Sequence, residues 1–146
     1  MTQLHLSLQD LPCAMLSASH SVHILLVEDD ALIREWMAEV LSGAGYAVTE
    51  AASGKEALNI LAGDEAISLL ITDNRMPGMT GAALIADVRS RSPVLPILLV
   101  TGYASRGEGI GSDIALLAKP FREAGLLAAV RALIPARPDF AAAAAA

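Results

Sequence analysis

The sequence is poor in the residues on which several classes of protein depend. It has a single cysteine, Cys13, so no disulfide can close within the chain, and a reducing, cytoplasmic setting fits best. Aromatic residues make up only 3% of it, which argues against a surface that stacks bases. Basic residues are outnumbered 10 to 16 by acidic ones, and a formal charge of −6 disfavours nucleic acid and anionic membranes as partners. No apolar run approaches the roughly 18 to 20 residues that cross a bilayer, so we expect no membrane insertion.

The chain length and its two ends predict one domain with short additions. A sequence of 146 residues suits a single domain with an ordinary core. Residues 1–21 mix strand-like alternation with a Pro, Ser and Ala stretch, and we interpret them as an N-terminal extension. Residues 22–135 form the expected domain, and residues 136–146 are expected to be a C-terminal tail that ends in low-complexity alanine.

Strand and helix patterns alternate through the expected domain. Short apolar runs predict strands over 23–27, 67–72, 96–100 and 114–118, and residues 46–50 are also interpreted as a strand. Helical spacing predicts helices over 31–42, 54–62, 81–90 and 122–133, with Ser53 as the cap of the second. The first of these helices is predicted to bury one apolar stripe: Leu32, Ile33, Trp36, Met37, Val40 and Leu41. Strands that are apolar throughout must be buried on both faces, so they predict an α/β fold with a parallel sheet between two helical layers.

The segment between the last two predicted strands departs from this pattern. Residues 102–113 are only 12 residues with glycine at four positions, and a parallel crossover needs about a dozen residues including its helix. We therefore expect the fourth helix of the alternation to be shortened to a turn or mobile.

Polar side chains follow the predicted strands at the points where the strands end. Glu28, Asp29 and Asp30 follow the first, Asp73 the third, Thr101 the fourth and Lys119 the fifth. The carboxyl ends of parallel strands meet at one edge of a sheet, where ligands bind in such folds. We therefore expect acidic groups from two strands, a hydroxyl and an ammonium group to converge there.

A cluster of carboxylates at this edge predicts a bound cation. Two carboxylates about 4 Å apart repel by roughly 4 kcal/mol at an intermediate dielectric. Oxygen ligands without histidine or cysteine select a hard ion, and Mg²⁺ is the expected one. Beside such an ion a carboxylate can attack phosphorus, with Lys119 providing positive charge for the phosphoryl oxygens and Thr101 a donor.

Four segments resemble the signature segments of two-component response-regulator receiver domains. They are Ile24–Asp30, Thr72–Gly81, Leu99–Gly102 and Leu117–Phe121, and the resemblance covers residues 22–134. It implies the flavodoxin-like (βα)5 fold, a doubly wound sandwich whose five-stranded parallel sheet has the order 2-1-3-4-5.

The resemblance also implies a role for each matching residue. Asp73 corresponds to the phosphoacceptor, and Thr101 and Lys119 to the hydroxyl and the lysine that contact the phosphoryl group. Glu28, Asp29 and Asp73 correspond to the magnesium ligands, together with the backbone carbonyl of Arg75. Pro120 corresponds to a cis proline of the family.

The implied function is phosphoryl transfer from a phosphohistidine to Asp73, which changes protein–protein contacts. The expected partners are a histidine kinase or histidine phosphotransfer protein and an unidentified downstream protein. We expect no output domain, so the chain would be a stand-alone regulator or the receiver of a hybrid kinase. It is expected not to be a turnover enzyme.

Simpler interpretations and two other functions stay open. Asp73 suits an ordinary turn, Lys119 a solvated surface, and Glu28, Asp29 and Asp30 the start of a helix, where negative charge is favourable. An aspartate-nucleophile phosphatase of the haloacid-dehalogenase kind is one alternative, but such enzymes carry an acid two residues after the nucleophile, where Arg75 stands. A receiver-shaped binding module that is never phosphorylated is the other.

Overall fold

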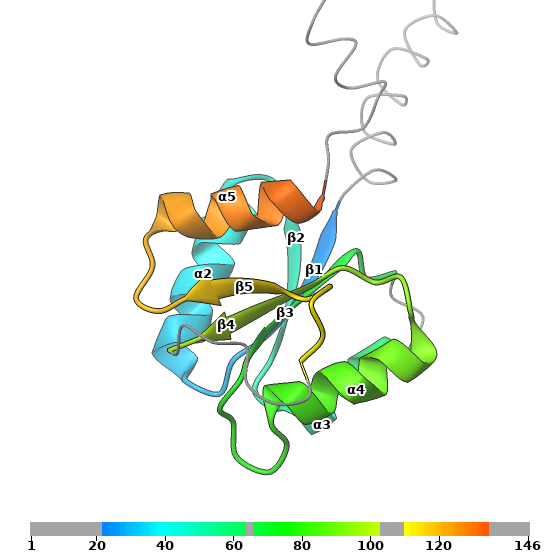
Figure 1. The fold of residues 1–146 in the computed structure, drawn as a ribbon. Coiled ribbons are helices and arrows are strands. Elements are labelled where there is room, and N and C mark those ends of the chain that lie inside the picture. The colour runs from blue at the N-terminus through cyan, green and yellow to red at the C-terminus, as the bar shows by residue number, and fades with distance from the viewer. Residues whose placement is uncertain (1–21, 64–65, 103–109, 135–146) are drawn as a thin grey trace, which may run out of the picture.

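The computed structural model describes residues 22–63, 66–102 and 110–134 (Figure 1). The expected extension at 1–21 and the expected tail at 136–146 lie outside these residues. So does most of the segment for which a shortened helix is predicted, because residues 103–109 are not described. The described residues of that segment, 102 and 110–113, contain no helix.

Five strands form one parallel sheet in the order β2-β1-β3-β4-β5, as the resemblance implies. The strands are β1 (His23–Val27), β2 (Ala47–Ala51), β3 (Leu69–Asp73), β4 (Ile97–Thr101) and β5 (Ala115–Ala118). Every residue of β3 and β4 is buried, which explains why these strands have no polar alternation. The carboxyl ends of β3 and β4 therefore lie inside the sheet, each with a neighbouring strand on both sides.

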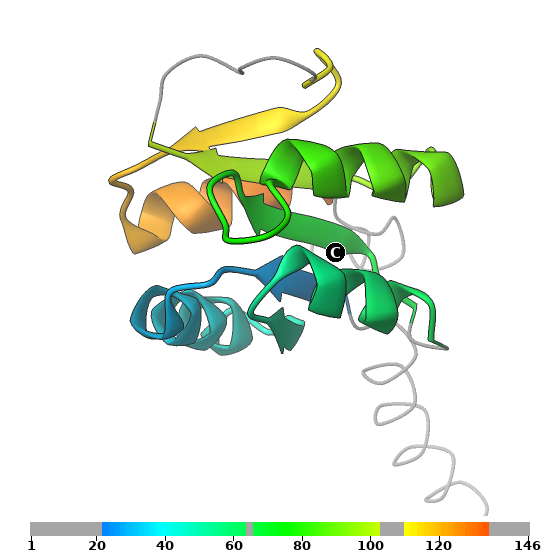
Figure 2. The ribbon, with the colours of Figure 1, turned by 90° about the horizontal axis from the view of Figure 1, so that it is seen from below.

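The described helices cover the two faces of the sheet in pairs (Figures 1 and 2). Helices α2 (Ala31–Gly43) and α5 (Glu123–Leu133) pack on one face, and α3 (Gly54–Leu61) and α4 (Gly81–Arg91) on the other. Adjacent residues of β1 enter different layers, because side chains alternate along a strand: Ile24 packs with α2 and α5, and Leu25 with α3 and α4. No helix of the described part is long and apolar enough to cross a membrane.

Side-chain caps fix the starts of three helices near the carboxyl edge of the sheet. Asp30 Oδ1 accepts hydrogen bonds from the backbone N–H groups of Leu32 and Ile33 at 3.0 and 3.2 Å. Ser53 caps α3, as predicted, and Thr80 caps α4, each accepting one bond of 3.1 Å from a backbone N–H three residues later. These caps satisfy N–H groups that a helix leaves without internal partners.

The predicted buried stripe of α2 is wrong at Leu32, whose side chain is 79% exposed, and Trp36 is 39% exposed. The stripe that faces the sheet instead includes Met37, Val40 and Leu41, which are buried. Leu32 and Trp36 are four residues apart, so they lie together on the flank of the helix beside that stripe. An apolar flank on α2 is therefore open to solvent.

Candidate functional site

The ends of four strands bring the predicted residues together. In the register of the sheet, Val27 pairs with Thr72, Asp73 with Val100, and Thr101 with Ala118. The residues that end or follow these strands therefore share one edge. Pairing between strands far apart in sequence, rather than any local motif, creates the site.

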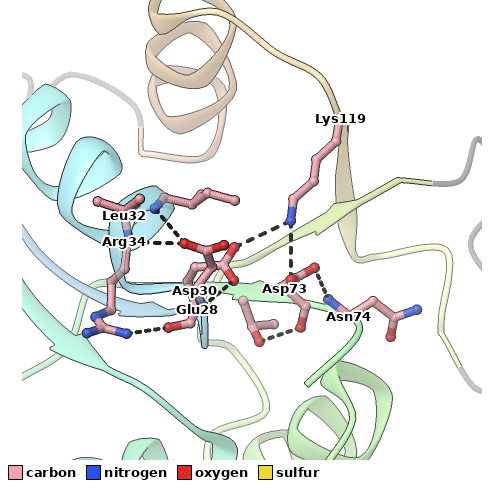
Figure 3. A network of polar contacts seen from close by, with 9 residues as sticks. Glu28, Asp30, Leu32, Arg34, Asp73, Asn74 and Lys119 are labelled. Atoms are coloured by element: carbon pink, nitrogen blue, oxygen red, sulfur yellow. Dashed lines mark hydrogen bonds and ion pairs between the residues drawn. The ribbon is translucent and has the colours of Figure 1, made fainter. Parts of the chain in front are cut away.

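Lys119 joins two of the carboxylates. Its Nζ lies 3.2 Å from Oδ2 of Asp73 and 3.4 Å from Oε1 of Glu28 (Figure 3). The Lys119 side chain is 27% exposed, whereas those of Asp73 and Glu28 are 11% and 3% exposed. The ammonium group thus covers two mostly buried carboxylates, and the neighbouring carboxylates raise the pKa of Lys119 even though burial opposes this. The peptide bond from Lys119 to Pro120 is cis, as the resemblance implies.

Glu28 is the most buried acidic residue of the cluster. Burial raises the pKa of its carboxyl from 4.5 to about 7, and the charge of Asp73 adds to this. The Asp30 backbone N–H, which donates to Oε2 at 3.1 Å, and the nearby Lys119 charge act in the opposite direction. Burial therefore disfavours the charged form of the Glu28 carboxyl, and additional positive charge nearby would stabilise that form.

Asp73 is held rigidly between β3 and α4. Its Oδ1 accepts a hydrogen bond of 2.7 Å from the backbone N–H of Asn74. The N–H of Gly81, the first residue of α4, donates to the carbonyl of Asn74 at 2.8 Å. A Cβ at Gly81 would lie 2.5 Å from the Asp73 carbonyl oxygen, so only glycine allows this approach.

The three predicted acidic metal ligands fit a hard divalent cation. One carboxylate oxygen each from Glu28, Asp29 and Asp73 lie within 4.8 Å of one another. Asp29 is exposed, so this side of the cluster is open to water. All donors are oxygens and one side is wet, which suits Mg²⁺ because this ion keeps several water ligands.

An open pocket of about 340 Å³ lies over Asp73. It is lined by Asp73, Asn74, Arg75, Thr101, Gly102 and Lys119. Thr101 is only 3% exposed, and its carbonyl accepts a 2.8 Å hydrogen bond from the backbone N–H of Lys119. The structure therefore brings Thr101, Lys119 and Arg75 to one cavity with Asp73.

A second pocket adjoins the site and was not predicted from the sequence. It measures about 440 Å³ and is lined by Ile33, Trp36, Lys119, Pro120 and Phe121. The rings of Trp36 and Phe121 are 5.8 Å apart. We call these five residues the Trp36 patch. Helical spacing gave no signal for this patch, because it places Leu32 and Trp36 on one stripe with the buried residues Met37, Val40 and Leu41.

Known proteins similar to this chain share both its sequence pattern and its fold. Residues 24–131 match the family model of the response regulator receiver domain. The response regulator protein FleR of Pseudomonas aeruginosa is 39% identical over 108 residues, which are 71% of this chain and 23% of FleR. The response regulator MprA of Mycobacterium bovis is 40% identical over 118 residues, 78% of this chain and 51% of MprA. The chain thus spans about half or less of these relatives.

Solved structures extend the comparison to three dimensions. The chemotaxis response regulator CheY4 of Vibrio cholerae has a TM-score of 0.72 and 32% identity, with 78% of this chain and 99% of that chain covered. The response regulator TrrA of Thermotoga maritima, solved in complex with Mg²⁺ and beryllofluoride, has a TM-score of 0.70 and 30% identity, with 77% and 99% covered. The match over residues 24–131, together with the shared fold, shows that this chain belongs to the response regulator receiver domain family.

Proposed function

We propose that this chain is the phosphoacceptor of a two-component phosphorelay and that Asp73 accepts a phosphoryl group from a phosphohistidine. The observation that carries the proposal is the position of the Asp73 carboxylate. The Asp73 side chain is 11% exposed, lies 3.2 Å from the Lys119 ammonium group, and shares a candidate metal site with Glu28 and Asp29. A carboxylate in this setting is close to positive charge and open to a pocket.

In the transfer, an oxygen of Asp73 attacks phosphorus. The bond from phosphorus to the histidine nitrogen breaks as the bond to oxygen forms, and the nitrogen keeps the electron pair. Lys119 stabilises negative charge on the phosphoryl oxygens, and the Thr101 hydroxyl donates to one of them. Glu28, Asp29, Asp73 and the Arg75 carbonyl would hold Mg²⁺, which supplies further neutralisation of that charge when bound.

The acyl phosphate would change contacts with a downstream protein. Phosphorylation replaces one carboxylate charge by about −1.5 to −2 and adds acceptor oxygens. An acceptor at this position draws the Thr101 hydroxyl towards Asp73. The two positions of Thr101 then differ in their affinity for a partner. The product stays bound to the chain, so the protein is an acceptor and not a turnover enzyme.

The Trp36 patch is the surface on which we expect the donor protein to dock. Lys119 lines both the pocket over Asp73 and the pocket of the patch, so the two surfaces are continuous. A donor whose phosphohistidine reaches Asp73 must also cover the Trp36 patch, which includes Lys119. Leu32, 79% exposed, extends the apolar surface. A histidine kinase or histidine phosphotransfer protein with apolar side chains around its histidine fits this surface.

The decisive experiment is incubation with acetyl phosphate and Mg²⁺, followed by intact-protein mass spectrometry. The wild type should gain the mass of one phosphoryl group, and the adduct should be cleaved by hydroxylamine. Asp73→Asn should abolish it, while Asp87→Asn on α4 should not. Catalytic turnover of phosphate esters would instead identify a phosphatase. If the wild type gains no adduct, the alternative of a receiver-shaped binding module that is never phosphorylated would be favoured.

A further inference from the structure

We propose that the guanidinium group of Arg75 is a second cation for the phosphoryl group, a role separate from that of the Arg75 backbone carbonyl. The inference rests on the proposed phosphorylation of Asp73 and identifies an additional phosphoryl-binding residue. Its starting point is the lining of the pocket over Asp73. Within the described chain, the cations of that lining are Lys119 and Arg75.

The backbone that carries Arg75 is fixed relative to Asp73. Asn74, which lies between them, donates its N–H to Asp73 Oδ1 at 2.7 Å and accepts a bond from the Gly81 N–H at 2.8 Å. The backbone directly before Arg75 is thus held by hydrogen bonds. Arg75 itself is exposed and lines the pocket. A long side chain on a fixed base can reach an incoming group without a backbone movement.

The charge of the site favours this second cation. Lys119 already contacts the carboxylates of both Asp73 and Glu28, at 3.2 and 3.4 Å. Converting the Asp73 carboxylate to an acyl phosphate adds up to about one further negative charge. The single charge of Lys119 is already shared between two carboxylates. A metal ion that balances the three carboxylates before transfer cannot change its charge afterwards. Arg75 supplies a positive charge at the same pocket to compensate.

The geometry of the guanidinium group suits a phosphoryl group. Its N–H groups form a planar fork that binds two phosphoryl oxygens at once. For a bound cation, by contrast, Arg75 is a like charge that weakens affinity. Removing the Arg75 charge should therefore have opposite effects on the two kinds of ligand.

The test compares Arg75→Gln with the wild type for two probes. Titration calorimetry measures the Kd for Mg²⁺ alone and then the Kd for beryllofluoride, a phosphoryl mimic, in saturating Mg²⁺. In Arg75→Gln the affinity for beryllofluoride should fall roughly fivefold to tenfold. The Mg²⁺ affinity should stay equal or become slightly tighter. Arg75→Lys should recover part of the beryllofluoride affinity, and Arg91→Gln, at the exposed end of α4, should change neither.

Two results would overturn the inference. Unchanged beryllofluoride affinity in Arg75→Gln shows that the guanidinium group does not contact the phosphoryl group. Equal loss of affinity for both probes shows a distorted site rather than a missing contact. If the wild type itself binds no beryllofluoride and gains no adduct from acetyl phosphate, the proposed function fails. If the wild type binds beryllofluoride and Arg75→Gln binds it equally well, only the inference about Arg75 fails.

Discussion

Nζ of Lys119 lies 3.2 Å from Oδ2 of Asp73, although 46 residues separate them along the chain. The contact exists because β3 and β5 both pair with β4 and end at the same edge of the sheet. The central strand β3 brings the carboxylate and the edge strand β5 brings the cation. Neither residue has this neighbour unless β3, β4 and β5 pair with one another.

Replacing Lys119 tests this contact. Lys119→Met removes the cation that faces Asp73 and keeps most of the side-chain volume, so labelling by acetyl phosphate should slow by roughly 100-fold. Lys55, on the exposed surface of α3, is the only other lysine, and Lys55→Met is the matched control. Equal labelling rates in both variants would exclude a role for the ammonium group.

The apparent affinity for Mg²⁺ should depend on pH through Glu28. Since its pKa is raised to about 7, a proton competes with the ion below that pH. The apparent Kd should therefore be about tenfold higher at pH 6 than at pH 8. In Glu28→Gln the overall affinity should be lower and this dependence much flatter. A wild-type affinity that is constant over this range would contradict the prediction.

The metal-free protein should lose stability as the pH rises. The folded-state pKa of Glu28, about 7, is above the ordinary value of 4.5, so the folded state binds this proton more tightly than the unfolded state. The resulting stabilisation is complete below pH 4.5 and is lost as the pH rises through 7, by at most about 3 kcal/mol. Urea unfolding of Glu28→Gln should show less of this decline. Adding Mg²⁺ to the wild type at pH 8 should restore the stability that it loses as the pH rises.

The Trp36 patch should matter for a protein donor and not for a small one. Trp36→Ala removes the largest side chain of the patch and should slow transfer from a phosphorylated histidine kinase at least tenfold. Labelling by acetyl phosphate should change less than twofold. Val94→Ala provides the control, because Val94 is 91% exposed in a different part of the surface. Equal slowing with both donors would point to damage at Asp73 instead.

Two glycine substitutions should have opposite consequences. At Gly81 a methyl group would lie 2.5 Å from the Asp73 carbonyl oxygen and 2.8 Å from Cα of Asn74, so Gly81→Ala should destabilise the protein by about 2 kcal/mol or more. At Gly43, the last residue of α2, a methyl group would meet nothing within 4 Å, and Gly43→Ala should be neutral or stabilising by up to about 1 kcal/mol. Thermal unfolding of both variants measures the difference.

The strands β1, β3 and β4 were predictable because their burial removes almost all polar residues. The limits of β1, His23–Val27, agree with the prediction. The third strand was predicted over 67–72 and extends over Leu69–Asp73, since the carboxylate of Asp73 stands at the sheet edge while its backbone still pairs with Val100. An apolar run marks the middle of a buried strand, but polar ends belong to it as well.

The different burial of the neighbouring residues Glu28 and Asp29 could not be predicted, whereas the interpretation of Asp30 as a helix cap is confirmed. Glu28 is buried, Asp29 is exposed at the candidate metal site, and Asp30 caps α2. These differences depend on the turn of the backbone between β1 and α2, which no spacing rule specifies. The exposure of Leu32 was missed for a similar reason, because periodicity gives a helix face only to within one residue's rotation.

The hydrogen bond from the Lys119 N–H to the Thr101 carbonyl has a practical consequence. At 2.8 Å it joins the backbones of Thr101 and Lys119, the two residues that we propose contact the phosphoryl group. A shift of Thr101 towards an acyl phosphate therefore alters the geometry at this amide. In an ¹⁵N-labelled sample, the Lys119 amide resonance would serve as a single internal gauge of how far the population has moved, without any partner protein or attached dye.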